Sequence, residues 1–290
     1  MEKILITGAR GYIGACLTKH LSTLFRTTAA YFRKSPLYIP DIKWKKLDVT
    51  DKNSVEKVFE ESLPNVVVHC SAIASIAECE INPYLAEKVN VEGTDNMVKA
   101  CTKFGAYLLF LSTDMVFDGE NAPYDEHSIP SPLSVYGKTK LEAEKLCPPT
   151  SLVLRLSLCY GHSVCGRKSF LEKAIEKIKQ GEKVVFFHDE WRSPLWIWDL
   201  AKVVERIIKH RPTGILHLGG TERMSRLEMA ERACKIYGID SSFIEIASRV
   251  EFHSPPRPKD LTLDISNFKL MFPDFSFTSF EKVLSLRVGG

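Results

Sequence analysis

The chain has 290 residues, of which 44% are hydrophobic and 26% charged, a composition typical of a folded globular protein rather than a disordered or fibrous one. Its 39 basic and 36 acidic residues give a net charge of +3 and form no long block of one sign, so no nucleic-acid partner is expected. The sequence enters a strand pattern at once in "MEKILITG" and has no apolar run near the ~20 residues that span a bilayer. We therefore expect a cytoplasmic protein with no membrane contact.

The cysteines argue against a disulfide framework and against a zinc site. The chain has eight, and they form no CxxC pair and no Cys/His cluster with the spacing of a zinc site. Several lie inside apolar runs, which is typical of buried thiols in a reducing compartment. Neither a disulfide framework nor a metal site is expected.

In the first half of the chain, short apolar runs alternate with longer amphipathic ones. Strands are predicted at 3–8, 27–32, 44–49, 65–72, 106–113 and 151–158, and helices at 12–25, 54–63, 82–105 and 136–147. Continuous apolar strands that alternate with helices predict parallel βαβ units with both faces of the sheet covered. The fold class expected is α/β, a Rossmann-type doubly wound parallel sheet.

The second half is less regular. It contains a helix at 169–181, three tryptophans (Trp191, Trp196 and Trp198) before a helix at 200–210, a strand at 214–220 and a helix opened by the capping box "SRLE". The tryptophans suit either the wall of a pocket or the core, and core is favoured. We predict a Rossmann domain at 1–161 and 196–220, and a smaller mixed α/β substrate-binding lobe at 162–195 and 221–290.

A glycine-rich loop joins the first strand to the first helix. In "LITGARGYIG", Gly8 permits a tight turn, Gly11 lets the backbone approach a pyrophosphate, and Gly14 lets helix and strand pack closely. Tyr12 and Ile13 belong to the same loop. Because the motif follows a strand and opens a helix, it predicts a dinucleotide site rather than an ordinary turn.

The residues after the second predicted strand favour one form of the dinucleotide. Sites for NAD usually carry an acid about 20 residues beyond the glycines, but no Asp or Glu lies between Gly14 and Lys34. The strand instead ends in "YFRKS", and Arg10 lies inside the loop. Guanidinium and ammonium groups bind a 2′-phosphate, so Arg10, Arg33 and Lys34 predict NADP(H) in preference to NAD(H). The alternative is that the two strand-end cations form a solvated turn.

A tyrosine and a lysine lie one helical turn apart in "SVYGKTK". Tyr136 and Lys140 share a helix face, where an ammonium would lower the pKa of a phenol and help it to exchange protons. The strand end "LFLSTDMVFDG" offers Ser112 and Thr113 to orient a carbonyl, although both hydroxyls would also suit a strand exit, and Thr113 is preferred. With the glycine loop upstream, this combination predicts carbonyl reduction.

These motifs together carry a family resemblance. In order, "TGARGYIG", "LDVTD", "VVHCSA", "STDMVFDG", "YGKTKLEAE" and "RLSLCYG" resemble the extended short-chain dehydrogenase/reductase family, and its dTDP-4-dehydrorhamnose reductase branch is the most similar. The C-terminal motifs "RSPLWIWDLA", "GILHLGG" and "RPKDLTLD" also resemble that branch, so the resemblance covers nearly the whole chain.

The resemblance implies roles for particular positions. Thr113, Tyr136 and Lys140 would be catalytic, and Tyr136 and Lys140 would also touch the cofactor. Further cofactor contacts are implied at Asp48, Val49, Ser71, Ala72 and Asn90, with Asn90 supporting the proton path or the fourth strand. Asp114 would shape the substrate pocket, and Arg257 would bind the phosphates of a nucleotide sugar.

Two departures from the branch concern the sugar. Met115 stands where its members commonly have a tyrosine, and Leu158 where they have a tryptophan. The function expected is an NADPH-dependent reductase of a 4-keto nucleotide sugar, and a homodimer is compatible with the sequence. The alternative is a cofactor-binding regulatory protein, because the regulatory subunit of methionine adenosyltransferase resembles the same branch.

Overall fold

The computed structural model describes residues 1–33, 35–252 and 257–286. Lys34 and the segment before Arg257 therefore lie outside the described residues. The strands are β1 (Lys3–Thr7), β2 (Arg26–Tyr31), β3 (Lys43–Lys46), β4 (Val66–His69), β5 (Tyr107–Thr113), β6 (Leu152–Leu156), β7 (Cys159–Tyr160), β8 (Val184–Phe187), β9 (Trp191–Arg192), β10 (Leu195–Trp196), β11 (Gly214–Leu218), β12 (Met224–Ser225) and β13 (Ile244–Ala247).

The helices lie between these strands and in the C-terminal part. They are α1 (Tyr12–Leu21), α2 (Lys52–Ser62), α3 (Ile76–Ile81), α4 (Pro83–Glu87), α5 (Gly93–Phe104), α6 (Val135–Leu146), α7 (Phe170–Lys179), α8 (Ile197–His210), α9 (Arg226–Tyr237), α10 (Ser266–Met271) and α11 (Phe280–Ser285). Single turns are η1 (Lys88–Glu92), η2 (Asp114–Val116), η3 (Ser241–Phe243) and η4 (Arg249–Glu251).

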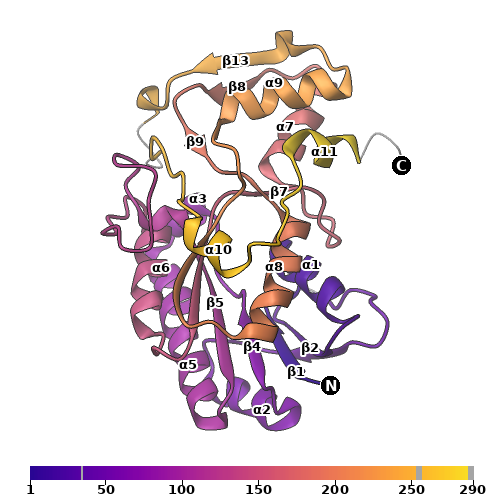
Figure 1. The fold of residues 1–290 in the computed structure, drawn as a ribbon, viewed down its shortest axis with the longest axis vertical. Coiled ribbons are helices and arrows are strands. Elements are labelled where there is room, and N and C mark those ends of the chain that lie inside the picture. The colour runs from indigo at the N-terminus through magenta and orange to yellow at the C-terminus, as the bar shows by residue number, and fades with distance from the viewer. Residues whose placement is uncertain (34, 253–256, 287–290) are drawn as a thin grey trace.

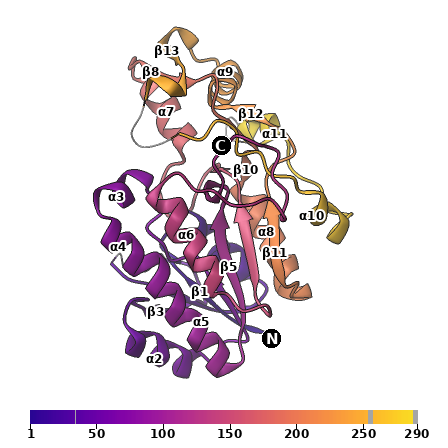
Figure 2. The ribbon, with the colours of Figure 1, turned by 90° about the vertical axis from the view of Figure 1, so that its left-hand side faces the viewer.

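Within the described residues, a central sheet of seven parallel strands has the order β11-β6-β5-β4-β1-β2-β3. Buried residues of the strands pack with α1 and α8 on one face and with α2, α5 and α6 on the other. Figure 1 shows this layer below the lobe, and Figure 2 shows α2, α5 and α6 in front of it. The predicted doubly wound parallel sheet is confirmed.

The strand order predicts a ligand site between β1 and β4. The chain winds from β1 toward β2 and β3 on one side and toward β4, β5 and β6 on the other, so the winding direction reverses at β1. Ligands of open α/β sheets bind outside the carboxyl ends of the strands at this position. The ends of β1, β4 and β5 carry Gly8, Ser71 and Thr113, which are therefore brought to one edge of the sheet.

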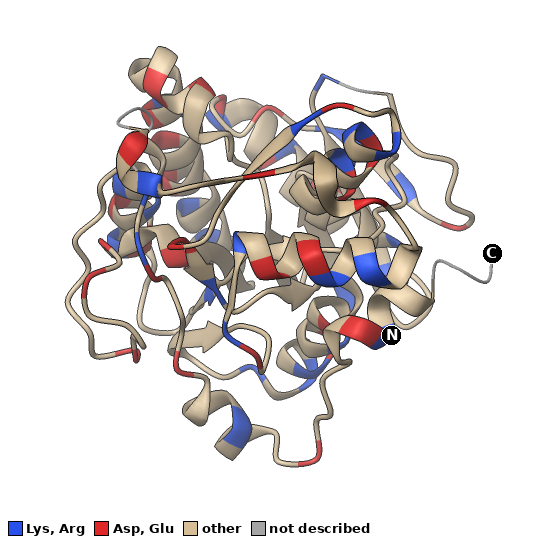
Figure 3. Cartoon of the chain, turned by 90° about the horizontal axis from the view of Figure 1, so that it is seen from above, with Lys and Arg blue, Asp and Glu red and all other residues tan. Residues whose placement is uncertain are grey.

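The lobe lies beyond that edge and has a separate core. Its apolar residues come mainly from α7, α9 and α11, and β8 pairs in parallel with β13 above them (Figure 1). The α9 helix begins with the predicted capping box, in which Ser225 and Glu228 bind each other's backbone N–H groups. Acidic and basic residues are intermingled on the elements seen from above in Figure 3.

One segment packs differently from the predicted division of the chain. The sequence assigns 221–290 to the lobe. However, Leu261, Phe268 and Phe272 belong to the apolar core that the central sheet shares with α1 and α8. The reason is that α10 lies against edge strand β11, where Phe272 contacts His210 at the end of α8 with ring centroids 5.4 Å apart. Covering an edge strand in this way removes apolar surface from water. The other domain boundaries stay a prediction.

Candidate active site

The glycine loop is packed so tightly that side chains cannot replace its glycines. Gly8 has a φ of +61°, and a Cβ atom there would lie 2.9 Å from the backbone of Cys70 and Ser71. A Cβ at Gly14 would lie 2.3 Å from the Gly8 carbonyl oxygen. Gly11 is the N-cap of α1, whose first N–H groups face the edge of the sheet. This geometry suits the pyrophosphate of a dinucleotide.

Arg10 has hydrogen-bonding capacity that the described residues leave unused. Its Nε and Nη1 atoms are buried and have no hydrogen-bond partner among those residues. Buried donors of this kind are normally paired, so an anionic group would complete the site. Arg33 is exposed at the end of β2, with its guanidinium 5.7 Å from the Phe32 ring centroid. Whether these donors bind a cofactor phosphate stays a prediction.

The other loop residues have defined positions. The Tyr12 hydroxyl donates to the Gly161 carbonyl, while Ile13 lines the cavity that also contains Thr113 and Tyr136. The Asp48 carboxylate accepts from the N–H and hydroxyl of Thr50, which places it in the turn before α2. Their contact with a cofactor stays a prediction.

The other predicted cofactor contacts lie near the ends of neighbouring strands. They are Val49, Ser71, Ala72 and Asn90. The buried Val49 packs closely on the backbone at Gly93, and the Ser71 N–H donates to Thr7 Oγ1 over 3.1 Å. Ala72 follows directly. Asn90 is fully buried, and its side chain accepts from the Ile73 N–H and donates to the Ile73 carbonyl after β4. Its role at a cofactor site stays a prediction.

The catalytic helix α6 is held against the end of β5. Ser134 caps it by accepting from the Gly137 N–H over 3.1 Å. A Cβ at Gly137 would lie 2.2 Å from the Met115 carbonyl oxygen, so the helix backbone rests directly on η2. This contact brings Tyr136 beside Thr113, and both line the same cavity. Burial, opposed by the Thr113 hydroxyl and reinforced by the charge of Asp114, raises the pKa of Tyr136.

Lys140 lies on the same helix but contacts different groups. Its Nζ donates to the Leu111 carbonyl over 2.7 Å and lies 3.8 Å from the Phe110 ring centroid. Burial lowers the pKa of Lys140 to about 8. The expectation that Lys140 lowers the pKa of Tyr136 is therefore not met in this structure, because the ammonium is bonded to a strand carbonyl and burial of the phenol dominates.

Ser112 is directed away from a role in orienting substrate. Its hydroxyl donates to Glu144, which is buried and paired with Arg155 over 2.7 Å. The Thr113 hydroxyl instead accepts from the Met115 N–H over 3.2 Å and faces Tyr136. The catalytic role of Thr113 stays a prediction.

The Tyr136 side chain opens into a cavity of about 320 Å³. Asp114 lines it, with Oδ2 buried and without a hydrogen-bond partner among the described residues. Burial, opposed by Arg192, raises the pKa of Asp114. Met115 and Leu158, the two departures from the reductase branch, line the same cavity. They give it a thioether and an aliphatic wall.

Three arginines converge on one carboxylate at the lobe side of this cavity. Arg192, Arg226 and Arg257 pair with Glu190 at 3.2, 3.0 and 3.0 Å, and all four line the cavity. Burial alone would raise the pKa of Glu190, but the charges of Arg226, Arg192 and Arg257 outweigh it and hold that pKa at about 2. Sequence reasoning selected only Arg257. Arg192 and Arg226 meet because β9 and β12 pair, a long-range contact with no local signal.

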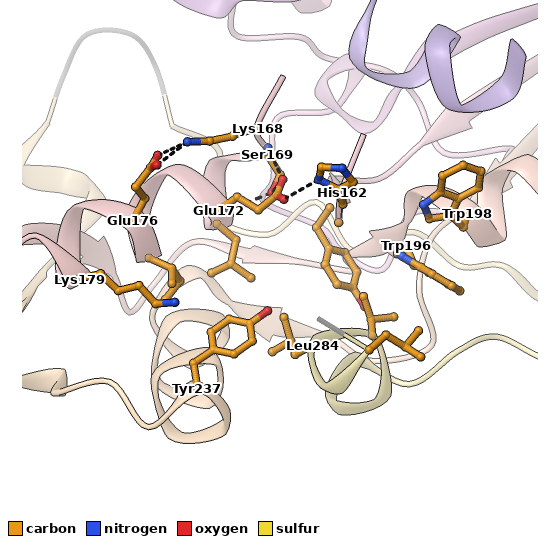
Figure 4. Close-up of a pocket in the computed structure, with 16 residues that line it drawn as sticks. His162, Lys168, Ser169, Glu172, Glu176, Lys179, Trp196, Trp198, Tyr237 and Leu284 are labelled. Carbon is orange, nitrogen blue, oxygen red and sulfur yellow. Dashed lines mark hydrogen bonds and ion pairs between the residues drawn. The ribbon is translucent and has the colours of Figure 1, made fainter. Parts of the chain in front are cut away.

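A larger groove lies elsewhere in the molecule. It has a volume of about 960 Å³ and lies between α7, α9, α11 and the start of α8 (Figure 4). Trp196 and Trp198 form part of its wall, whereas Trp191 is not among its lining residues. Lys168 is paired with Glu176 at its rim (Figure 4). None of the predicted catalytic residues lines the groove, so the smaller cavity is the candidate active site.

No helix within 1–33, 35–252 or 257–286 combines the length and the apolar character needed to cross a membrane. Across the same residues, no group of three or more His, Cys, Asp and Glu side chains is arranged to hold a metal ion.

Comparison with known proteins places the chain in a family. It is 31% identical over 281 residues to the methionine adenosyltransferase 2 subunit beta of Mus musculus, covering 93% of this chain and 82% of that protein. The structure resembles a dTDP-4-dehydrorhamnose reductase from Clostridium acetobutylicum, with 29% identity, coverage of 99% and 98%, and a TM-score of 0.83. It also resembles the Bacillus anthracis dTDP-4-dehydrorhamnose reductase in complex with NADP, with 26% identity, full coverage of both chains and a TM-score of 0.87. Because the family described as "RmlD substrate binding domain" matches residues 1–286, the chain belongs to this family, which confirms the resemblance carried by its sequence motifs.

Proposed function

We propose that this protein is an NADPH-dependent reductase that converts the 4-keto group of a nucleotide sugar to an alcohol. The observation that carries this proposal is that Tyr136 and Thr113 line one cavity together with Ile13 of the glycine loop. The similarity to dTDP-4-dehydrorhamnose reductases supports it.

In this proposal the side chains of the cavity have separate roles in the reduction. When bound, the nicotinamide supplies the hydride that the carbonyl carbon receives. Thr113 orients the carbonyl oxygen, and Tyr136 donates its proton to that oxygen as the alcohol forms. The raised pKa of Tyr136 keeps the phenol protonated before the reaction. The Lys140 ammonium, which is bonded to the Leu111 carbonyl, would hold the ribose of the nicotinamide and so fix the ring against the substrate.

The unused donors of Arg10 support the preference for NADPH. Replacing Arg10 by alanine is expected to raise the KM for NADPH by about 10-fold or more, because a hydrogen bond to a charged group contributes ~1.5–3 kcal/mol. The KM for NADH, which has no 2′-phosphate, should change less than about 2-fold by the same reasoning. Initial rates with both cofactors measure this, and Lys19→Ala on the exposed face of α1 is the control. Equal changes for NADPH and NADH would contradict a phosphate contact.

The arginine cluster supports a diphosphate in the substrate. Arg192, Arg226 and Arg257 carry three positive charges, against the two carboxylates Glu190 and Asp114 that line the same cavity. A surplus of positive charge in a partly buried cavity favours a ligand with two negative charges.

Arg257 tests this assignment because it is the most exposed of the three arginines. Arg257→Ala is expected to raise the KM for the nucleotide sugar about 10-fold and to change kcat less than about 3-fold, since it contacts groups that do not react. The control is Arg223→Ala, which removes an arginine paired with Asp260 outside the cavity. A fall in kcat at unchanged KM would rule out a phosphate-binding role for Arg257.

The function itself is tested by the loss of NADPH absorbance with dTDP-4-dehydro-6-deoxy-L-lyxo-hexose. Oxidation of NADPH at saturating substrate is the expected result, and NADH run in parallel measures the cofactor preference. Absence of oxidation by a protein that binds NADPH would reject this sugar, and Met115 and Leu158 would then be the first positions to examine, because they line the cavity and depart from the reductase branch.

A second function is supported by the relatives named methionine adenosyltransferase 2 subunit beta. The chain would then bind the cofactor while regulating a partner enzyme. Co-purification with a stoichiometric methionine adenosyltransferase, together with no turnover of keto sugars, would favour this function. Turnover that requires Tyr136 would favour the reductase.

A further inference from the structure

A chain of buried hydrogen bonds runs behind the candidate site from the glycine loop toward the catalytic helix. It begins at Thr7, the last residue of β1, which is fully buried. The N–H groups of Cys70 and Ser71 both donate to Thr7 Oγ1 over 3.1 Å. Thr7 Oγ1 is also 2.7 Å from His69 Nδ1. Because the hydroxyl oxygen already accepts two hydrogen bonds, its own proton is directed to His69 Nδ1.

The next link fixes the form of the histidine. A ring nitrogen that accepts a hydrogen bond carries no proton, so the neutral imidazole of His69 is protonated on Nε2. Nε2 lies 3.2 Å from Thr94 Oγ1, and the Thr94 hydroxyl donates to the Asn90 carbonyl over 2.6 Å. The opposite tautomer would leave a donor facing the Thr7 proton. Burial and the charge of Lys140 lower the pKa of His69 to about 3, which agrees with a neutral ring.

The final links reach the backbone of the catalytic tyrosine. The Asn90 amide nitrogen donates to the carbonyl of Ile73 over 3.1 Å and to Thr139 Oγ1 over 3.0 Å. The Thr139 hydroxyl donates to the Tyr136 carbonyl over 3.0 Å. The hydroxyls of Thr7, Thr94 and Thr139 therefore each accept at least one hydrogen bond and donate one. The series joins the strand ends around the glycine loop to α6.

His69 has a second connection to the site through an aromatic ring. Its imidazole stacks on Phe110 with ring centroids 5.8 Å apart, and the same ring lies 3.8 Å from Lys140 Nζ. The imidazole therefore supports the aromatic surface against which the ammonium rests.

We propose that His69, neutral and protonated on Nε2, is a positioning residue that sets the location of the glycine loop relative to Tyr136 and Lys140. It touches neither substrate nor the reacting atoms in this assignment. Its effect is to place a bound dinucleotide within reach of the phenol, so the inference rests on the proposed reductase function.

The tautomer is tested directly on the wild-type protein. In ¹⁵N NMR spectra of the histidine-labelled chain, His69 is identified as the signal that disappears in His69→Gln. We expect the pattern of a neutral ring protonated on Nε2 that does not titrate between about pH 5 and 9, unlike a histidine with the ordinary pKa of ~6.5. Protonation on Nδ1, or titration within that range, would overturn the proposal.

The positioning role is tested by the dissociation constant for NADPH, measured by fluorescence titration. His69→Phe is expected to raise this constant about 10-fold, because small displacements of positioning groups cost about that much or more. The control is His217→Phe, which alters an equally buried histidine on β11 that is bonded to Tyr124 and Arg155 instead. If both variants bind NADPH with the wild-type constant, or weaken it equally, His69 has no positioning role.

Thr139→Val keeps His69 in place and removes the last link. We expect NADPH affinity within about 2-fold of wild type and a kcat about 10-fold lower, since the Tyr136 carbonyl and the Asn90 amide lose their bonds to Thr139 while the link from Thr7 to His69 stays in place. An unchanged kcat in a folded variant would also overturn the proposal. The NMR and NADPH-binding measurements require no keto sugar. They therefore test the role of His69 even if the protein does not reduce the proposed substrate.

Discussion

Replacing Tyr136 by phenylalanine is expected to lower kcat by about 10²–10⁴-fold, the contribution typical of a positioned general acid. The substitution removes the hydroxyl of Tyr136 from the cavity that Thr113 also lines and leaves the ring in place. Burial raises the pKa of the phenol, so wild-type Tyr136 is protonated at neutral pH and has a proton to donate. The affinity for NADPH should change by less than about 2-fold, because the lost hydroxyl stabilises the transition state and not the bound cofactor.

The measurement is kcat at saturating NADPH and keto sugar for the wild type and for Tyr136→Phe. Tyr160→Phe is the matched control, since this tyrosine lies on β7 and lines the larger groove rather than the catalytic cavity. Its kcat should stay within about 2-fold of wild type, as expected for a residue outside the chemistry. Full turnover by Tyr136→Phe would refute the assignment of the proton donor.

The second large effect concerns stability. Glu190→Gln is expected to lower the free energy of unfolding at pH 7 by about 3 kcal/mol, because it leaves Arg192, Arg226 and Arg257 without their shared countercharge in a buried setting. Each pKa unit corresponds to about 1.4 kcal/mol, so the drop of the Glu190 pKa from its ordinary 4.5 to about 2 is consistent with a loss of that size.

The pH dependence of this difference has a definite sign. The folded-state pKa of Glu190 is lowered, so its stabilisation is present above pH 4.5 and is lost as the pH falls toward 2. The difference in unfolding free energy between wild type and Glu190→Gln should therefore shrink over that range in urea titrations. The control is Glu281→Gln, which removes a half-exposed partner of Arg232 and should cost at most about 1 kcal/mol. A constant difference from pH 7 to 2 would contradict the ion-pair explanation.

Local sequence patterns predict much of this site. The glycine spacing, the Thr113 strand end and the Tyr136 helix each depend on residues close in the chain, and parallel strands bring their carboxyl ends to one edge. Local sequence patterns do not predict which groups the Lys140 ammonium contacts. Its position depends on the Leu111 carbonyl and the Phe110 ring, which a helical spacing does not specify.

The parts that sequence reasoning missed depend on long-range packing. Arg192 and Arg226 resemble surface arginines in the sequence, and only the pairing of β9 with β12 brings them to Glu190. Phe268 and Phe272 likewise follow the lobe in the chain but cover the edge of the sheet, because α10 returns to β11. Apolar periodicity indicates that such residues are buried without indicating which core receives them.

The most direct test of the reductase proposal is the transfer of deuterium from NADPH deuterated at C4 of the nicotinamide. The protein is incubated with this cofactor and dTDP-4-dehydro-6-deoxy-L-lyxo-hexose, and the sugar product is analysed by mass spectrometry. The proposal predicts an alcohol that carries deuterium on the former carbonyl carbon, formed by the wild type and not by Tyr136→Phe. Tight binding of the cofactor with no deuterium in the sugar would contradict it and favour the regulatory function.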